Sequence, residues 1–164
     1  MPIEPDEFRR ALAQLASGVT AVTTRDAAGR PLGLTVTAFS SVSLAPPLVL
    51  VCVDERSETH AGFRESGRFG VSLLADDQEE VSRRFAGGGP LKFETTPLVE
   101  GATGVPLVAG AVAHLECRVV ATHTAGDHAI YVGEVVAAAV HPGRPLLYHR
   151  GRYHRLAGGD GGPA

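Results

Sequence analysis

Apolar and polar residues alternate with a period of two over much of the chain, a pattern typical of β-strands with one buried face. The alternation is cleanest over 113–121, and after a turn at 125–127 a second apolar segment returns over 129–140. These two segments are therefore predicted to form a long hairpin. The predicted strands cover 19–24, 34–44, 48–53, 69–74, 113–121 and 129–140, followed by a short terminal pair at 146–148 and 152–156.

Helical periodicity is confined to short segments. Three helices are predicted, over 6–16, 57–67 and 76–85, with an irregular segment over 87–110. Asp6 and Ser57 are the predicted N-caps of the first two, each of which ends at a glycine. Asp76 and Glu79 have the spacing of a capping box that opens the third. The apolar run 48–53 is continuous, so it is predicted to be buried on both faces of its sheet.

The order of these elements predicts a mainly β fold. No β-α-β rhythm repeats, and the 20 glycines and 11 prolines indicate many turns between short strands. An antiparallel sheet of this size hides its edges most simply by closing into a barrel. The 164 residues are enough for one domain, which is predicted to span 1–157, with a glycine-rich disordered tail at 158–164.

Composition excludes several classes of function. The net charge is −3 and no apolar run approaches the length of a membrane span, so neither nucleic acid nor a membrane is an expected partner. Cys52 and Cys117 lie inside apolar segments and are predicted to be reduced core thiols, and no metal site is expected. With no signal peptide at the N-terminus, the chain is expected in the cytoplasm. The motifs GxGxxG, GxSxG, HExxH and CxxC are absent, which argues against a Rossmann site, a serine hydrolase or a zinc enzyme.

The most informative segment is 33–47, which carries five hydroxyl side chains among small residues. Small side chains let a flat ring approach the backbone, and hydroxyls and main-chain amides offer hydrogen bonds to its polar edge. The alternative is an edge strand whose threonines and serines face solvent. On pattern alone, the alternative is the commoner arrangement.

Four further segments contain candidate binding residues, each with a simpler structural explanation. Ser57 begins a helix whose N-terminus suits a phosphate, or it is only an N-cap. The cations and phenylalanines between 83 and 93 suit a pyrophosphate or an adenine, or they form a solvated helix face. His128 follows a tight turn and could donate to a ligand, although such histidines are often merely exposed. The basic and aromatic segment 148–155 is interpreted as a terminal hairpin rather than an RNA-binding patch.

Taken in order, several segments resemble the flavin reductase-like family, whose fold is the FMN-binding split barrel, a Greek-key antiparallel β-barrel with a few short helices. The segments that carry the resemblance are 17–24, 33–47, 66–74, 126–128, 145–148, Gly151 and Tyr153. The resemblance is strongest to the NAD(P)H:flavin oxidoreductase components of two-component flavin-dependent monooxygenases. It implies a homodimer that reduces FAD or FMN with NADH or NADPH and passes reduced flavin to a monooxygenase. Two positions depart from the family pattern, which often has Asn in place of Ser72 and an acidic residue in place of Ala45.

The resemblance also implies roles for individual residues. His128 would be the catalytic residue, facing the nicotinamide or the flavin edge with Tyr153 nearby. The flavin ring would lie along Thr35, Val36, Thr37, Ala38, Ser40 and Ser41. The ribityl and phosphate group would lie near Asp54, Ser57 and Thr59. The phosphate or the adenylate end would be bound by Arg84, Phe85, Lys92 and Phe93. Two alternatives stay open: a split barrel that holds flavin as a tight prosthetic group, as oxidases of the pyridoxamine phosphate type do, and a non-enzymatic ligand-binding barrel.

Overall fold

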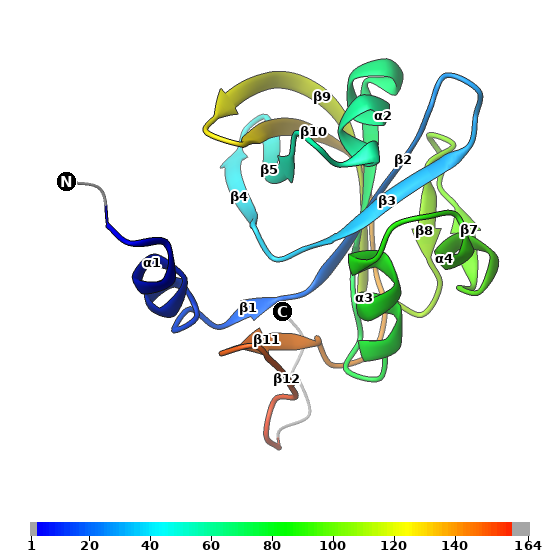
Figure 1. Cartoon of the computed structure of the whole chain (residues 1–164). Coiled ribbons are helices and arrows are strands. Elements are labelled where there is room, and N and C mark those ends of the chain that lie inside the picture. The colour runs from blue at the N-terminus through cyan, green and yellow to red at the C-terminus, as the bar shows by residue number, and fades with distance from the viewer. Residues whose placement is uncertain (1–2, 159–164) are drawn as a thin grey trace.

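The computed structural model describes residues 3–158, and its main feature is a curved sheet of seven antiparallel strands (Figure 1). The strands follow the order β3-β2-β6-β9-β10-β5-β4. Their bounds are Thr20–Arg25 for β2, Pro31–Val36 for β3, Phe39–Leu44 for β4, Pro47–Asp54 for β5, Arg68–Leu73 for β6, Ala113–Ala125 for β9 and His128–Val140 for β10. The predicted mainly β, antiparallel barrel is confirmed, and so is the long hairpin formed by β9 and β10.

Smaller elements surround this sheet. A three-stranded sheet has the order β1-β11-β12, and β7 pairs with β8 inside the segment that was predicted to be irregular. The remaining bounds are Ser17–Gly18 for β1, Leu98–Glu100 for β7, Pro106–Val108 for β8, Leu147–His149 for β11, Arg152–His154 for β12, Pro5–Leu12 for α1, Glu58–Ser66 for α2, Glu79–Ala86 for α3 and Leu91–Glu94 for α4. Figure 1 shows α2 and α3 on either side of β3.

The segment predicted as one long strand over 34–44 is two strands. It breaks after Val36, and the chain resumes at Phe39 on the opposite edge of the sheet, because β3 and β4 are the first and last strands of the order. Hydrophobic alternation alone does not reveal such a break, since both halves satisfy the same period. The link of Thr37 and Ala38 thus joins the two edges of the barrel.

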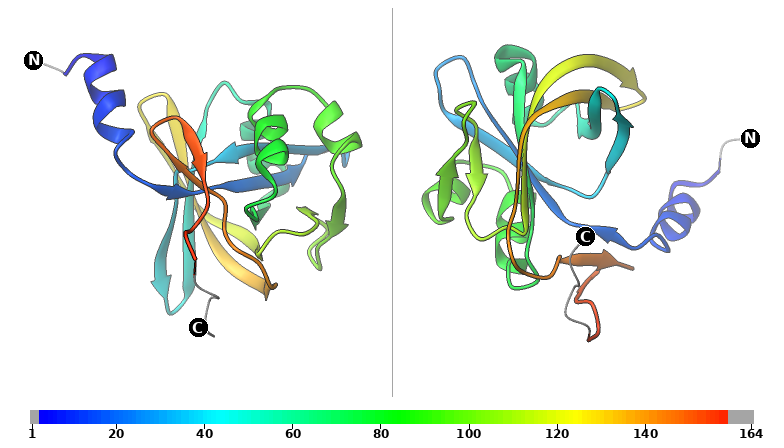
Figure 2. Two further views of the ribbon diagram at one scale, coloured as in Figure 1. Left: turned by 90° about the horizontal axis from the view of Figure 1, so that it is seen from below. Right: turned by 180° about the vertical axis from the view of Figure 1, so that it is seen from behind.

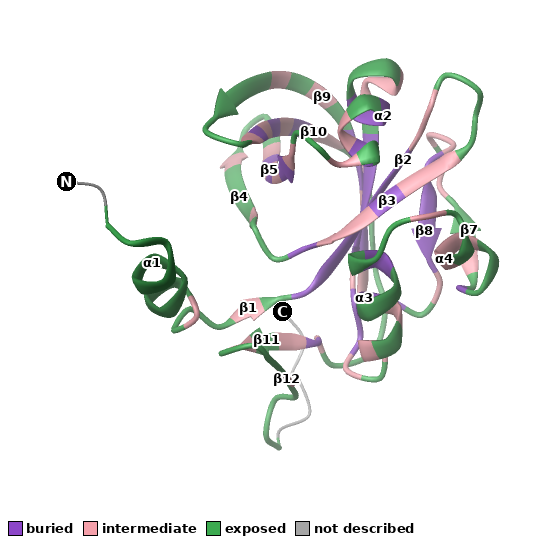
Figure 3. Cartoon of the chain, in the orientation of Figure 1, coloured by how far each residue is buried: buried purple, intermediate pink, exposed green. Residues whose placement is uncertain are grey.

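The barrel interior is filled by side chains from alternate positions of its strands (Figure 3). In β5, Val49, Val51 and Val53 are buried while the residues between them are partly exposed. The prediction that 48–53 is buried on both faces was therefore wrong, because the outer face of β5 borders a hollow rather than a second layer. Phe69 packs so closely on Gly133 that a Cβ there would lie 2.5 Å from the ring.

A second core lies between α3, β1, β8 and the C-terminal hairpin. Its buried members include Val19, Phe85, Val108 and Leu146, and Tyr153 packs against them. Ser72 faces this region, and its Oγ accepts a hydrogen bond of 2.9 Å from the Val108 amide. The serine at this departure from the family pattern thus still makes a buried polar contact.

Two of the three predicted helix starts differ from the structure. α1 begins at Pro5 after Glu4, while Asp6 forms an ion pair of 3.0 Å with Arg9 instead of capping the helix. The helix ends at Leu12, before the predicted end at 16, and β1 begins at Ser17. All eight α1 residues are described and none is buried; the helix stands clear of the barrel (Figure 2). α3 begins three residues later than the predicted capping box, at Glu79.

The second helix agrees with its prediction. Ser57 is the N-cap of α2, its Oγ accepting a hydrogen bond from the Thr59 amide, and Gly67 ends the helix in the left-handed conformation. Among the described residues, no helix has the length and apolar character needed to cross a bilayer, and no three His, Cys, Asp or Glu side chains are arranged to hold a metal ion. The predicted tail lies, beyond Gly158, outside the described residues.

Candidate functional site

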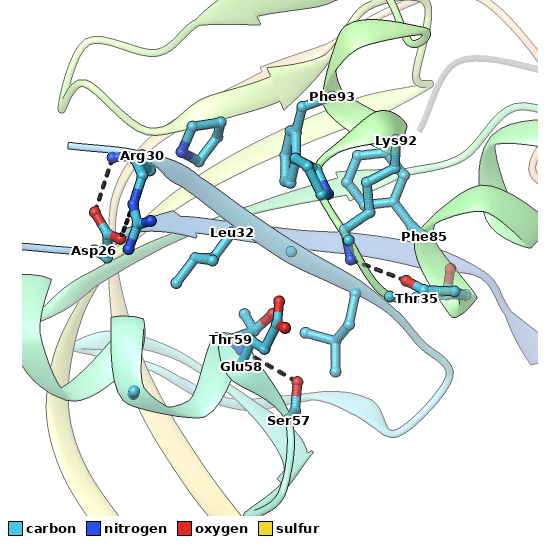
Figure 4. Close-up of a pocket in the computed structure, with 18 of the residues that line it drawn as sticks. Asp26, Arg30, Leu32, Thr35, Ser57, Glu58, Thr59, Phe85, Lys92 and Phe93 are labelled. Carbon is cyan, nitrogen blue, oxygen red and sulfur yellow. Dashed lines mark hydrogen bonds and ion pairs between the residues drawn. The ribbon is translucent and has the colours of Figure 1, made fainter. Parts of the chain in front are cut away.

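The larger of two hollows is a groove of about 1090 Å³ floored by β3 (Figure 4). One wall is the first part of α2, and the other is the segment from the end of α3 through α4. It brings together six of the predicted site residues, namely Thr35, Ser57, Thr59, Phe85, Lys92 and Phe93. Its volume lies at the upper end of the roughly 300–1,000 Å³ typical of small-molecule sites.

Glycines set the distance between the walls and the floor. A Cβ on Gly62 of α2 would lie 2.7 Å from a methyl group of Leu32, so the glycine lets the helix approach β3 closely. A Cβ on Gly33 would lie 3.1 Å from the Phe85 ring and 3.0 Å from the Val22 carbonyl oxygen. Gly33 and Gly62 therefore allow β3 to pack closely against its neighbours, because a larger side chain at either position would crowd the surrounding elements.

The α3–α4 wall carries a half-buried cation between aromatic rings. Lys92 Nζ donates to the Gly87 carbonyl at 3.0 Å and lies 5.9 Å from the centroids of both Phe85 and Phe93. The two rings meet edge to face at 5.2 Å. Desolvation lowers the pKa of Lys92, while the negative charge of Glu58 acts in the opposite direction. An ammonium partly removed from water in this way interacts strongly with an anion that enters the groove.

The α2 wall is acidic. Glu58 and Glu65 both line the groove from this helix, and Figure 4 places Glu58 opposite Lys92. Arg56 also lines the groove, but it is bound to Asp54 by side-chain hydrogen bonds of 3.1 and 2.8 Å. These bonds lower the pKa of Asp54, and its negative charge offsets the positive charge of Arg56. The α2 N-terminus is therefore less suited to a phosphate than the sequence suggested, and the opposite wall is better suited.

A second hollow, of about 520 Å³, lies beyond the break between β3 and β4. Three more predicted residues line it, Thr37, Ala38 and Ser40. Cys52 lines it as well, so this thiol is only partly buried, while Cys117 is fully buried and its pKa is raised by desolvation to about 12. The predicted segment of small and hydroxyl-bearing residues, 33–47, thus begins in the larger hollow and continues into the second one.

Six predicted binding residues line neither hollow, and two of them, His128 and Tyr153, are described below. Val36 points into the barrel core, and Ser41 is exposed on β4. Arg84 donates to the Thr95 carbonyl at 2.9 Å, and Asp54 is held by Arg56. Only their main-chain groups or small rearrangements could serve a ligand in either hollow, so their binding roles stay predictions.

His128 lies at the tip of the β9–β10 hairpin, beside the end of β5. It pairs with Asp54 across the strands, and its Nδ1 lies 2.7 Å from an Asp127 carboxylate oxygen. This contact lowers the pKa of Asp127 and orients the imidazole, leaving Nε2 free to face a ligand. The side chain is 44% exposed, and its predicted catalytic role stays a prediction.

Tyr153 does not lie near His128 within one protomer. It belongs to β12, which lies at the opposite end of the molecule from the β9–β10 tip (Figure 1). Its hydroxyl is instead 2.8 Å from Ser82 Oγ, and the Arg83 guanidinium covers its ring at 4.9 Å. The predicted proximity to His128 was therefore wrong for a single chain, and a direct contact with flavin stays untested.

Sequence reasoning missed several groove residues. Leu32 and Pro90 supply apolar surface, and the turn between β2 and β3 contributes Asp26 and Arg30, joined by a 2.7 Å ion pair. Leu32 could not have been placed by alternation from Thr35, because residues three apart in a strand point to opposite faces; Leu32 lies toward Gly62 of α2, whereas the Thr35 hydroxyl bonds to Ser82 of α3. The glycines at 87–89, before Lys92, also line the groove.

Comparison with known proteins identifies the family. The model of the flavin reductase like domain matches residues 12–157. The chain belongs to the flavin reductase-like family. It is 43% identical to an NADH-dependent flavin reductase of a Rhodococcus species, over 94% of this chain and 88% of that protein. It is also 40% identical to the reductase component of 4-nitrophenol 4-monooxygenase/4-nitrocatechol 2-monooxygenase from Rhodococcus opacus, over 93% of this chain and 81% of that protein.

A solved flavin reductase-like structure is closely similar throughout. The NADH:FAD oxidoreductase of Streptomyces globisporus C-1027, determined in complex with NAD and FAD fragments, superimposes with a TM-score of 0.88 at 40% identity. The match covers 96% of this chain and 97% of that one. The split-barrel resemblance predicted from the sequence is thus confirmed, and these names favour the reductase interpretation over a tight prosthetic group or a non-enzymatic barrel.

Proposed function

We propose that this protein is an NADH-dependent flavin reductase, which transfers a hydride to FAD or FMN and supplies the reduced flavin to a separate monooxygenase. The observation that carries the proposal is the nearly full-length match to proteins named for that activity. The groove adds a physical reason, because it combines a floor formed by β3 with aromatic rings and one half-buried cation. The absence of a nucleophile or an acid–base pair is expected, since flavin itself supplies the electron acceptor when bound.

The groove residues fit a flavin phosphate and its sugar chain. Lys92 can donate to phosphate oxygens, and the Ser57 hydroxyl keeps its own proton for a ligand because its oxygen only accepts from Thr59. The Thr35 hydroxyl donates to the Ser82 carbonyl at 2.5 Å, so toward a ligand Thr35 acts as an acceptor. Beyond the strand break, the exposed Thr37 and Ala38 leave main-chain groups within reach of a ring edge.

The protein's part in the reaction is binding and orientation. Two flat rings must be stacked at a distance of roughly 3–3.5 Å for efficient hydride transfer. The small residues of segment 33–47 limit the positions that a ring can take. His128, which Asp127 orients, offers a hydrogen-bond donor at the tip of the β9–β10 hairpin. No strong acid is needed, because the hydride moves without a proton from the protein.

The activity is tested by mixing the purified protein with NADH and FAD, FMN or riboflavin under anaerobic conditions. We expect NADH absorbance to fall together with the oxidised flavin band near 450 nm. Repeating the assay with NADPH establishes the preferred donor. Absence of NAD(P)H consumption with all three flavins would refute the proposal, whereas a yellow protein that survives dialysis and is not bleached would indicate a tight prosthetic group.

The proposal includes a homodimer. The apolar face of the N-terminal segment, formed by Ile3, Phe8, Leu12 and Leu15, has at least half of each side chain exposed in the protomer. A helix with no buried residue gains little from folding on its own chain, so a second subunit is the natural surface for it. Light scattering should give twice the chain mass, and Phe8→Glu with Leu12→Glu should lower it toward the monomer value.

The proposed location is the cytoplasm. NADH is the proposed reductant, and both cysteines are free thiols, as is usual in a reducing compartment. Fractionation of cells that produce the protein, with activity measured in each fraction, tests this assignment.

A further inference from the structure

Two partly buried hydrogen bonds, which share Ser82, link the C-terminal hairpin to the floor of the groove. Tyr153 Oη lies 2.8 Å from Ser82 Oγ, and the Ser82 carbonyl accepts from Thr35 Oγ1 at 2.5 Å. Ser82 is fully buried in the middle of α3, and Thr35 lines the groove. Ser82 therefore bonds to Tyr153, 71 positions later in the chain, and to Thr35, 47 positions earlier.

The contacts around this serine fix the position of α3. Phe85, one turn further along the helix, is buried against Gly33 on the groove floor. On the other side, the Tyr153 ring lies between the Arg83 guanidinium, 4.9 Å away, and the Tyr148 ring, whose centroid is 5.2 Å away. Ser82 has no access to water, so loss of the Tyr153 hydroxyl removes the partner that its Oγ has in the hairpin and the constraint that this bond places on α3.

The Tyr153 hydroxyl is thus engaged within its own chain rather than directed into either hollow. From these contacts we infer that Tyr153 is a positioning residue: through Ser82 it sets where α3 lies along β3, and so sets the width of the groove between Thr35 and the Phe85–Lys92 wall. This inference rests on the proposed function only in taking flavin as the groove ligand. It replaces the expected direct contact of Tyr153 with flavin by an indirect effect.

The test compares Tyr153→Phe with Tyr148→Phe in the full-length protein. Both substitutions remove one phenolic hydroxyl from the same hairpin, but among the described residues only the Tyr153 hydroxyl has a hydrogen-bond partner in α3. The dissociation constant for FMN is measured by fluorescence titration in the absence of NADH, and KM and kcat are measured with NADH. Thermal unfolding is recorded for each variant.

We expect Tyr153→Phe to raise both the dissociation constant and the KM for FMN about three- to tenfold, which corresponds to the loss of one hydrogen bond. The kcat should stay within twofold of the wild-type value. Tyr148→Phe should change neither constant. Ser82→Ala should reproduce the effect of Tyr153→Phe, and the double variant should be no worse than either single one, because both remove the same bond.

Two outcomes would overturn the inference. A Tyr153→Phe protein that melts at a lower temperature but binds FMN as wild type does would show a purely structural role. Equal effects of Tyr153→Phe and Tyr148→Phe on FMN binding would show that the hairpin matters but the hydroxyl does not. Neither outcome touches the proposed function, which fails only if the wild-type protein does not oxidise NADH with any flavin.

Discussion

Replacing Lys92 by methionine separates the phosphate-binding role of the groove from its other contacts. Methionine has a similar length and keeps the apolar packing against Phe85 and Phe93, but it removes the charge that donates to Gly87. Lys92 is the only lysine of the chain, and it is half-buried, so no second ammonium can replace it.

The expected loss of flavin affinity follows from the hydrogen bond between the Lys92 ammonium and the flavin phosphate, which methionine cannot form. A hydrogen bond to a charged group contributes about 1.5–3 kcal/mol, which corresponds to a roughly 10- to 150-fold weaker affinity. FMN and FAD carry a phosphate and riboflavin does not, so the loss should fall on the first two. We expect the dissociation constants for FMN and FAD to rise by that factor in Lys92→Met, while the constant for riboflavin changes less than twofold.

Fluorescence titration of each flavin measures these constants directly. Arg64→Met is the matched control, because it removes an exposed cation of α2 that does not line the groove. If Lys92→Met weakened riboflavin as much as FMN, the lysine would shape the groove without binding phosphate. If FMN binding were unchanged, the phosphate would lie elsewhere.

The pH dependence of FMN binding provides a second measure of the same group. Desolvation places the pKa of Lys92 below the 10.5 of an ordinary lysine, and phosphate binding requires the protonated amine. FMN affinity should therefore decline as the pH rises through this lowered pKa, earlier than for an exposed lysine. Lys92→Arg keeps its charge and should abolish the decline.

Three further outcomes are expected. His128→Ala should lower kcat about tenfold or more, the worth of one hydrogen bond in the reacting complex, while flavin affinity changes less; an unchanged kcat in steady-state assays would remove His128 from the site. Gly133→Ala, far from the groove, should lower the free energy of unfolding by about 1–3 kcal/mol in urea titrations, because its Cβ would overlap Phe69, without changing KM. Burial raises the pKa of Glu116, but hydrogen bonds from Thr103 and Ala102 outweigh it, so the pKa lies below 4.5 in the folded protein. The stabilisation from the carboxylate is present above pH 4.5 and lost as pH falls through the folded pKa, so Glu116→Gln should destabilise by about 1–3 kcal/mol at neutral pH and progressively less in acid.

The sequence predicted the features that depend on local pattern. The β9–β10 hairpin follows from alternation on both sides of a tight turn, and α2 follows from a serine cap and a terminal glycine. Ser57 and Thr59 were predicted from the start of a helix, and Lys92 from cations next to phenylalanines; all three line the groove, and their roles toward a ligand stay predictions.

Features that depend on distant contacts were not predicted. The break between Val36 and Phe39 depends on which sheet edge each half joins, and both halves show the same alternation. The start of α1 was misplaced because Pro5 and Glu4 compete with Asp6 for the same role. The partnership of Tyr153 with Ser82 arises only when the C-terminal hairpin packs on α3, which no local pattern reports.

The barrel is closed by covalent continuity rather than by a seventh ladder of hydrogen bonds. Thr37 and Ala38 span the gap between its first and last strands, and an extended chain gains only about 3.3–3.6 Å per residue, so the end of β3 at Val36 and the start of β4 at Phe39 must stay close. Over residues 3–158, β3 and β4 each pair with one neighbouring strand only, so their outward amides and carbonyls have no strand partner. The two edge strands thus leave main-chain donors and acceptors without a strand partner next to the hollow that Thr37, Ala38 and Ser40 line.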